Sequence, residues 1–217
     1  MDLFKKLALL SALAVTALMT GCATKAPYNY EALLESQPRS IVVIPPENNT
    51  VEVDAPYIYL STISRPLAEK GYYVFPVAVI DTFMKENGLP TTAEMNQVPL
   101  DKIHENIGAD AVLYVSINEW GQKFQVLSSN AIVEVTMKLV DARTGTLLWD
   151  ASASAVQQSD SGNAGLIGAL VSAVASQIAG SISDFTPQLA RTANQTAINA
   201  HNQGLLNGPY APKPQQK

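Results

Sequence analysis

Residues 111–156 decide the fold, because three strand-forming runs follow one another there. They read AVLYVSI (111–117), VEVTMKL (133–139) and LLWDASASAV (147–156), and DARTGT (141–146) separates the last two as a turn. In the second run apolar and polar residues alternate, which is the period of a strand with one buried face. The apolar residues of the third run share one face in the same way: Leu147, Trp149, Ala151, Ala153 and Ala155. The stretch predicts an antiparallel meander.

A parallel unit is predicted on the amino-terminal side of the meander. IVVI (41–44) is a short β-branched run that Pro45 and Pro46 end, which predicts a buried strand. Residues 56–70 have helical spacing of apolar side chains, and Tyr72–Phe75 follows as a second strand. Two strands joined by a helix predict a β-α-β unit. Pro66 lies inside the helical pattern and is expected to kink or divide it.

Two further helices are expected before the meander. Residues 81–87 form a short one with Asp81 as its cap, and residues 99–107 form an amphipathic one that ends at Gly108. The fold class is therefore α/β (α+β), with a mixed sheet of about five strands and helices packed on it. Residues 41–200 are predicted to form this single domain.

The only cysteine, Cys22, predicts how the protein is attached to the cell envelope. Lys5 and Lys6 precede an uncharged, mostly apolar run over 7–20, and Gly21 follows, which is the pattern of a signal peptide. Residues 1–21 are predicted to be a lipoprotein signal peptide that is cut before Cys22, which is then acylated. Met19 stands where such signals usually have leucine. An ordinary signal peptide with a chance cysteine, or an uncleaved anchor, remains the alternative.

The residue after the cysteine bears on the membrane in which the anchor lies. Ala23 stands there, and not the aspartate that retains lipoproteins at the inner membrane of enteric-type bacteria. The sequence therefore predicts an outer-membrane lipoprotein that faces the periplasm. Residues 22–40 are predicted to be a polar, lipidated tether, and residues 201–217 a proline-containing disordered tail.

Composition excludes several classes of function. The formal net charge is −5, which argues against binding nucleic acid or an anionic membrane surface through broad electrostatics. With Cys22 acylated no thiol remains for a disulfide, a thiolate nucleophile or a zinc–cysteine site.

Residues 164–185 form a second unusual segment. Asp160 and Asp184 bracket 23 residues without a charge, and an apolar stripe runs along the segment at helical spacing. A ridge of small residues recurs every four positions beside that stripe: Gly168, Ser172, Ser176 and Gly180. Small residues at this spacing permit close approach of two helices. The helix is expected to pack on its own sheet or on the ridge of another copy, and a membrane span is the third alternative.

No catalytic set is legible. His104 and His201 are the two histidines; they lie far apart in the sequence, lack metal-ligand spacing and are expected at the surface. No hydrolase, metalloprotease or phosphate-loop motif occurs, so no catalytic residue, cofactor site or metal site is predicted. Residues 45–50 are either a ligand loop or a rigid turn. Residues 119–125 are expected to join two strands, and Trp120 and Phe124 either anchor a partner or cover the sheet edge.

Four stretches together resemble a known family. They are PPENNT (45–50), PLAEKGYYV (66–74), GADA (108–111) and LVDARTGTLLW (139–149). Over about residues 36–195 the chain is similar to a family of bacterial lipoproteins of unknown function, of the vaccine-candidate surface-lipoprotein type. The last two stretches also resemble the TolB amino-terminal domain, CsgG-type lipoproteins and penicillin-binding-protein activators. The resemblance implies a sheet with helices packed on it, a binding role and a homodimer, and it supplies no catalytic residues.

The expected function is that of a non-enzymatic accessory or binding component of an envelope transport or assembly system. Its expected partners are the lipid membrane, through the acyl anchor, a second copy and an envelope protein. The alternatives are a membrane-embedded oligomer like a CsgG secretion channel, an activator of a cell-wall enzyme, and an enzyme that acts on wall or lipid.

Overall fold

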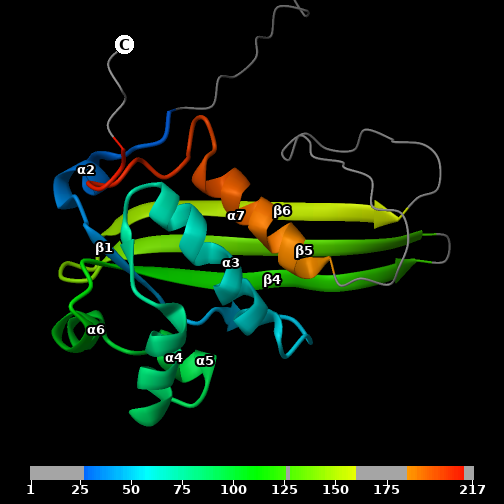
Figure 1. The fold of residues 1–217 in the computed structure, drawn as a ribbon, viewed down its shortest axis with the longest axis horizontal. Coiled ribbons are helices and arrows are strands. Elements are labelled where there is room, and N and C mark those ends of the chain that lie inside the picture. Colours follow the sequence, from blue (N-terminus) through cyan, green and yellow to red (C-terminus); the bar gives the residue numbers. More distant parts are fainter. Residues whose placement is uncertain (1–26, 126–127, 160–184, 213–217) are drawn as a thin grey trace, which may run out of the picture.

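The computed structural model describes residues 27–125, 128–159 and 185–212. Its centre is a mixed six-stranded sheet with the strand order β3-β1-β4-β5-β6, in which β2 also pairs with β4 (Figure 1). The strands are β1 (Ser40–Val43), β2 (Glu47–Asn48), β3 (Tyr73–Val74), β4 (Ala111–Gln125), β5 (Ser128–Asp141) and β6 (Leu147–Ser159). β1 is parallel to β3 and β4, whereas β4, β5 and β6 form an antiparallel meander. The predicted fold class, meander and parallel unit are confirmed.

Helices cover both faces of this sheet. They are α2 (Glu31–Ser36), α3 (Ala55–Glu69), α4 (Val77–Glu86), α5 (Thr92–Asn96), α6 (Leu100–Ile107) and α7 (Thr186–Ile198). The larger core joins α3 and α7 to one face, and the smaller joins α4, α5 and α6 to the other. In Figure 1, α3 and α7 run across the strands, while α4, α5 and α6 gather at one end.

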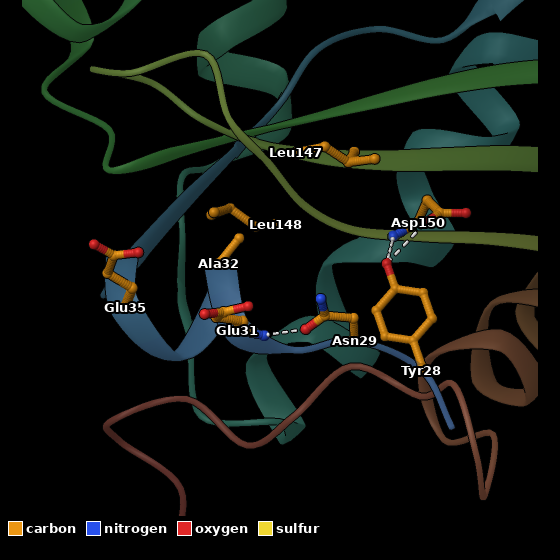
Figure 2. Close-up of a pocket in the computed structure, with 8 residues that line it drawn as sticks. All are labelled: Tyr28, Asn29, Glu31, Ala32, Glu35, Leu147, Leu148 and Asp150. Carbon is orange, nitrogen blue, oxygen red and sulfur yellow. Dashed lines mark hydrogen bonds between the residues drawn. The ribbon is translucent and has the colours of Figure 1, made fainter. Parts of the chain in front are cut away.

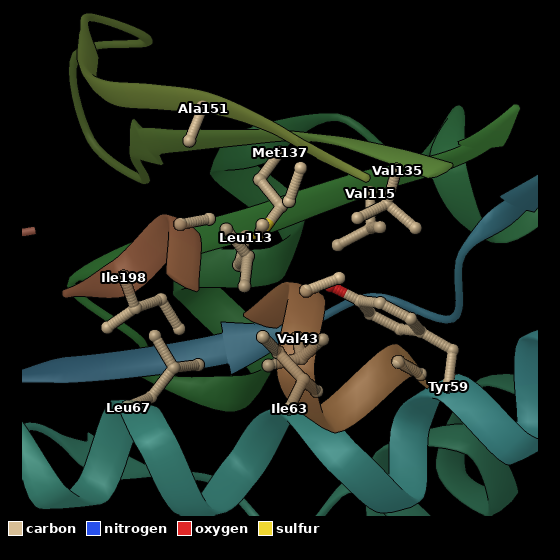
Figure 3. Packing of buried hydrophobic residues seen from close by; sticks show 14 of the residues in the cluster. Val43, Tyr59, Ile63, Leu67, Leu113, Val115, Val135, Met137, Ala151 and Ile198 are labelled. Atoms are coloured by element: carbon tan, nitrogen blue, oxygen red, sulfur yellow. The ribbon is translucent and has the colours of Figure 1, made fainter. Parts of the chain in front are cut away.

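The alternation of β1 explains how both cores form. Ile41 and Val43 belong to the larger core, whereas Val42 and Ile44 belong to the smaller one. A strand buried on both faces needs an uninterrupted apolar run, which IVVI provides. Figure 3 shows Val43 among side chains from α3 and from the meander, including Ile63 and Met137.

Two helices differ from their predictions. α3 continues through Pro66, because the proline lies in the last turn and removes one helical hydrogen bond there. α4 begins at Val77, directly after Pro76, so Asp81 lies inside the helix and does not cap it. The Asp81 carboxylate instead accepts a hydrogen bond of 2.7 Å from Lys85 Nζ.

The helix before the meander is confirmed, since α6 ends at Gly108, whose φ of 78° is left-handed.

The predicted tether over 22–40 is wrong for residues 28–40. These residues include α2, whose Leu33 is buried in the larger core, and they lead directly into β1. The tether was predicted from polar composition, but one buried leucine and the tyrosines ahead of it fix the segment to the sheet.

The predicted disordered tail over 201–217 is wrong for residues 201–212. Leu205 is buried, and the backbone N–H groups of Gly208 and Tyr210 donate to the carbonyls of Lys70 and Gly71 at 2.7 and 3.0 Å. Proline prevents this segment from joining a sheet, but the segment still packs in irregular form against the end of α3. The remainder of both predictions, residues 22–26 and 213–217, lies outside the described residues.

Two other predictions concern residues that the structure does not describe. The signal peptide over 1–21 lies wholly outside the described part, and the helix over 164–185 does so except for Phe185. Within the described residues, no helix has the length and apolarity to cross a membrane.

Candidate functional site

A pocket lies where the amino-terminal segment meets the start of β6 (Figure 2). Its volume is about 450 Å³. The lining comes from two parts of the chain: Tyr28, Asn29, Glu31, Ala32 and Glu35 on one side, and Leu147, Leu148 and Asp150 on the other. The segment that leads from Cys22 therefore builds one wall of the pocket.

Tyr28 fixes that wall to the sheet. Its hydroxyl donates to Asp150 Oδ1 at 2.7 Å and accepts from the Asp150 backbone N–H at 2.9 Å. Asn29 Oδ1 accepts from the backbone N–H of Glu31, the first residue of α2, at 2.8 Å (Figure 2). The outward backbone N–H of an edge strand thus finds its partner in a side chain of the amino-terminal segment.

The contact between Tyr28 and Asp150 holds the amino-terminal segment on the sheet. Burial, followed by the hydrogen bond to the Asp150 carboxylate, raises the pKa of Tyr28 to about 12. The phenol is therefore neutral near pH 7 and cannot act as a base there. Tyr28 and Asp150 are engaged with each other, and the pocket also carries the carboxylates of Glu31 and Glu35.

No metal centre is found in the part of the chain that the structure describes, since no group of three His, Cys, Asp or Glu side chains is arranged to hold an ion. His104 Nδ1 lies 2.9 Å from the carbonyl oxygen of Ala109, so this side chain is half-buried against the end of its own helix. His201 is exposed. The structure does not bring the two histidines together at a metal site.

The GADA stretch has a structural role. Asp110 Oδ2 accepts three hydrogen bonds, from the backbone N–H of Arg39, the backbone N–H of Ser40 and the Ser40 hydroxyl, at 3.0, 3.1 and 3.0 Å. The carboxylate thereby joins the start of β1 to the start of β4.

The aspartate of the DARTGT turn is equally structural. Asp141 Oδ1 accepts from the backbone N–H groups of Arg143 and Thr144 at 2.9 Å, and Oδ2 accepts from the Ser36 hydroxyl at 2.6 Å. Burial acts to raise the pKa of Asp141, but these hydrogen bonds outweigh it and lower the pKa below the usual value. Two of the stretches that carry the family resemblance therefore maintain the fold.

The two stretches singled out in the sequence as loops both contribute to the sheet. Within residues 45–50, Glu47 and Asn48 form β2, which pairs with β4, and Asn48 Oδ1 accepts from the backbone N–H and the hydroxyl of Thr50 at 3.0 and 2.8 Å in the turn that follows. The prediction that residues 119–125 join two strands is wrong, because they continue β4. Trp120 lies in the larger core, and a register shift between Ile117 and Glu119 places it there. Trp120 therefore covers the sheet and is not displayed to a partner.

The site residues predicted from the sequence are Cys22 and the ridge of Gly168, Ser172, Ser176 and Gly180. All of them lie outside the described residues. The sequence did not predict the role of Tyr28. Two tyrosines next to a short apolar patch were the available signal, since aromatic side chains are uncommon in a solvated tether.

Comparison with known proteins gives one family. The family model "Putative lipoprotein GNA1162-like" matches residues 28–210. The "Putative lipoprotein NMB1124/NMB1162" of Neisseria meningitidis is 42% identical over 207 residues, covering 94% of this chain and 96% of that protein.

A solved structure at 40% identity has the same fold. The crystal structure of lipoprotein GNA1162 from Neisseria meningitidis is 40% identical, with a TM-score of 0.55 over 58% of this chain and 88% of that one. The C-terminal domain of LpoB from Escherichia coli is 16% identical, with a TM-score of 0.36 over 65% and 91% of the two chains. A likeness at that level carries no argument about function.

Proposed function

Because the chain belongs to the GNA1162-like lipoprotein family, we propose that it is a non-enzymatic binding component of an envelope transport or assembly system. In this proposal acylated Cys22 holds the domain on the outer membrane, and the domain faces the periplasm. The observation that carries the proposal is that the folded domain begins only a few residues after the predicted lipoprotein signal. Five residues, 23–27, separate Cys22 from the anchored side chain of Tyr28.

The short connection between Cys22 and Tyr28 keeps the domain close to the membrane. A chain spans at most about 3.3–3.6 Å per residue, so Tyr28 is held within about 20 Å of Cys22. More than one acyl chain gives stable anchoring. A domain held this near the membrane meets partners that are themselves at the membrane surface.

The chemistry of the described site supports binding rather than catalysis. Tyr28 and Asp150 satisfy each other, and the aspartates of the two family stretches, Asp110 and Asp141, are occupied by backbone and serine donors. These groups hold strands and turns in place. What the molecule offers to a partner is therefore its shape and its exposed side chains.

The proposal is tested by capture of partners from the intact envelope. The lipidated full chain is crosslinked in cells and purified from membranes, with Cys22→Ser as the matched control that cannot be acylated. We expect one envelope protein to be recovered in constant proportion with the lipidated chain and to be lost with the variant. Equal recovery by both chains, or no constant partner, contradicts the proposal. Mass spectrometry of the amino-terminal peptide reports acylation separately.

A further inference from the structure

The side of the domain that faces the anchor carries exposed apolar and basic side chains. The first and last described residues lie on this side, at the top of Figure 1, together with α2 and the segment 203–212. Tyr30 joins the two, because its hydroxyl donates to the Gly204 carbonyl at 2.6 Å. This side includes the point from which the chain leads back to Cys22.

Three side chains define what we name the anchor-side surface: Leu34, Arg39 and Tyr210. Leu34 is 58% exposed and Tyr210 56% exposed. The Leu34 backbone N–H donates to the Tyr30 carbonyl at 2.9 Å, so Leu34 lies one helical turn after the tyrosine that contacts Gly204.

Arg39 and Tyr210 form a unit on this surface. Arg39 Nη2 donates to the Tyr210 hydroxyl at 3.1 Å, and the guanidinium carbon lies 5.7 Å from the centre of the ring. The contact positions a cation and an aromatic ring with a polar tip side by side. Tyrosine is enriched at membrane–water interfaces, and arginine is the residue best suited to bind phosphate in a bidentate manner.

We propose that the anchor-side surface lies against the phospholipid headgroups of the membrane that holds Cys22. The inference rests on the proposed acylation of Cys22. Leu34 enters the boundary between headgroups and acyl chains, the Tyr210 ring lies at headgroup level, and Arg39 binds lipid phosphate.

Glu31 and Glu35 line the pocket beside Leu147, whereas Leu34 is not part of that lining (Figure 2). Glu31 lies three residues before Leu34 and is therefore its neighbour on the helix surface. The contact with lipid accordingly rests on Leu34, Arg39 and Tyr210, and not on a net positive charge of α2.

The short connection favours lipid over a protein as the occupant. Tyrosine and arginine also form the centres of protein interfaces. A protein bound here must fit between the domain and a membrane that is at most about 20 Å from Tyr28 along the chain. The lipid surface already lies within that reach, and tethering raises its effective concentration enough for a weak contact to persist.

The test uses the fact that Cys22 is the only cysteine of the chain. Once it is acylated, a cysteine introduced elsewhere can be labelled alone with an environment-sensitive dye. The variants are Leu34→Cys and Tyr210→Cys, with Val79→Cys as the matched control. Val79 is 61% exposed, and its helix α4 lies at the opposite side of the molecule in Figure 1. The lipidated full chains are placed in vesicles of phosphatidylethanolamine and phosphatidylglycerol.

We expect the dyes at positions 34 and 210 to shift to the blue and to lose accessibility to aqueous iodide several-fold relative to position 79. Arg39→Gln should reduce the protection at 210, whereas Arg65→Gln, exposed on α3 and paired with Glu69, should not. Equal quenching at all three positions overturns the inference. Protection that occurs in native envelopes but not in pure lipid also overturns it and assigns the surface to a protein.

A failure of the proposed function gives a different experimental result from a failure of this inference. Mass spectrometry of the same samples reports whether Cys22 is acylated. An unacylated chain contradicts the anchor itself, whereas an acylated chain with equally quenched dyes contradicts only the orientation on the membrane.

Discussion

Single carboxylates hold this fold together at the turns, and Asp141 is the clearest example. Its oxygens accept from two backbone N–H groups and from the Ser36 hydroxyl, and its side chain is 3% exposed. The hydroxyl links the last turn before β6 to the end of α2. A family stretch that could be mistaken for a functional motif is therefore explained by structure.

Asp141→Asn is expected to destabilise the protein by about 1.5–3 kcal/mol at neutral pH, because hydrogen bonds to a charged acceptor are lost. The folded pKa of Asp141 is lowered. Its stabilising contribution is therefore complete above the ordinary carboxyl pKa near 4 and is lost as the pH falls through the lower folded pKa. Denaturant unfolding from pH 7 to pH 2 should show the difference between the two proteins shrinking in that acidic range. A constant difference would contradict the role of the charge, and Glu86→Gln, exposed on α4, is the control.

A buried polar network lies between α3 and α7. The Tyr59 hydroxyl donates to Asn194 Oδ1 at 2.7 Å, and Asn194 Nδ2 donates to Thr62 Oγ1 at 3.0 Å. All three side chains are buried. Figure 3 shows the Tyr59 ring beside the apolar residues of the larger core. Such a network stabilises one arrangement of the two helices only while every member is satisfied.

Tyr59→Phe should therefore cost about 1–3 kcal/mol, because Asn194 Oδ1 is left in the core without its donor. Tyr57→Phe makes the same change on the same helix, at a ring that is 46% exposed. Its effect should be close to zero. Thermal unfolding followed by circular dichroism compares the two, and similar melting temperatures would show that the network contributes little.

At the scale of elements, the carboxyl-terminal segment is a structural part of the domain. Gly71 follows α3 with a φ of 85°, and a Cβ placed on it would lie 2.1 Å from the backbone nitrogen of Ala211. Gly88 has the same φ of 85°, and a Cβ there would meet nothing within 4 Å. Substitutions at these two glycines therefore separate the free energy cost of a left-handed backbone from that of a steric clash.

Gly71→Ala is expected to destabilise the protein by more than Gly88→Ala. Both substitutions place an alanine in a left-handed backbone conformation, which costs about 1 kcal/mol or more. Only Gly71→Ala also displaces the segment that includes Leu205 and Tyr210. Limited proteolysis should release the carboxyl-terminal residues faster from Gly71→Ala than from Gly88→Ala. Equal rates would contradict the close packing at Gly71.

The elements that could be predicted from the sequence are those with a strong hydrophobic period. The strands around Val42, Val115, Val135 and Trp149 and the helix that ends at Gly108 are all present. α7 was missed, because its buried face consists largely of alanines and includes Asn194. The packing of residues 28–40 and 201–212 was missed because each segment is polar overall and only one of its two leucines, Leu33 or Leu205, is buried. The pocket could not be predicted, because it joins Tyr28 to Asp150 across 122 positions.

At the scale of the whole molecule, the segment 164–185 is the candidate contact between two copies of the chain. Its ridge of Gly168, Ser172, Ser176 and Gly180 stays a prediction from the sequence, because the ridge lies outside the described residues. The described elements on either side, β6 and α7, contact each other closely. A second copy of the chain is the partner that a self-complementary ridge of small residues fits.

Gly168→Leu combined with Ser172→Leu should therefore reduce the fraction of dimer, because two large side chains hold the helices apart. Ala169→Leu combined with Ala173→Leu adds comparable bulk to the same segment, one position away from the ridge. On a helix these positions point in another direction, so the second pair should leave association unchanged. Light scattering of the full lipidated chains in detergent measures both. If both pairs dissociate the protein equally, the segment acts through general packing, and if neither does, the ridge is not an interface between copies.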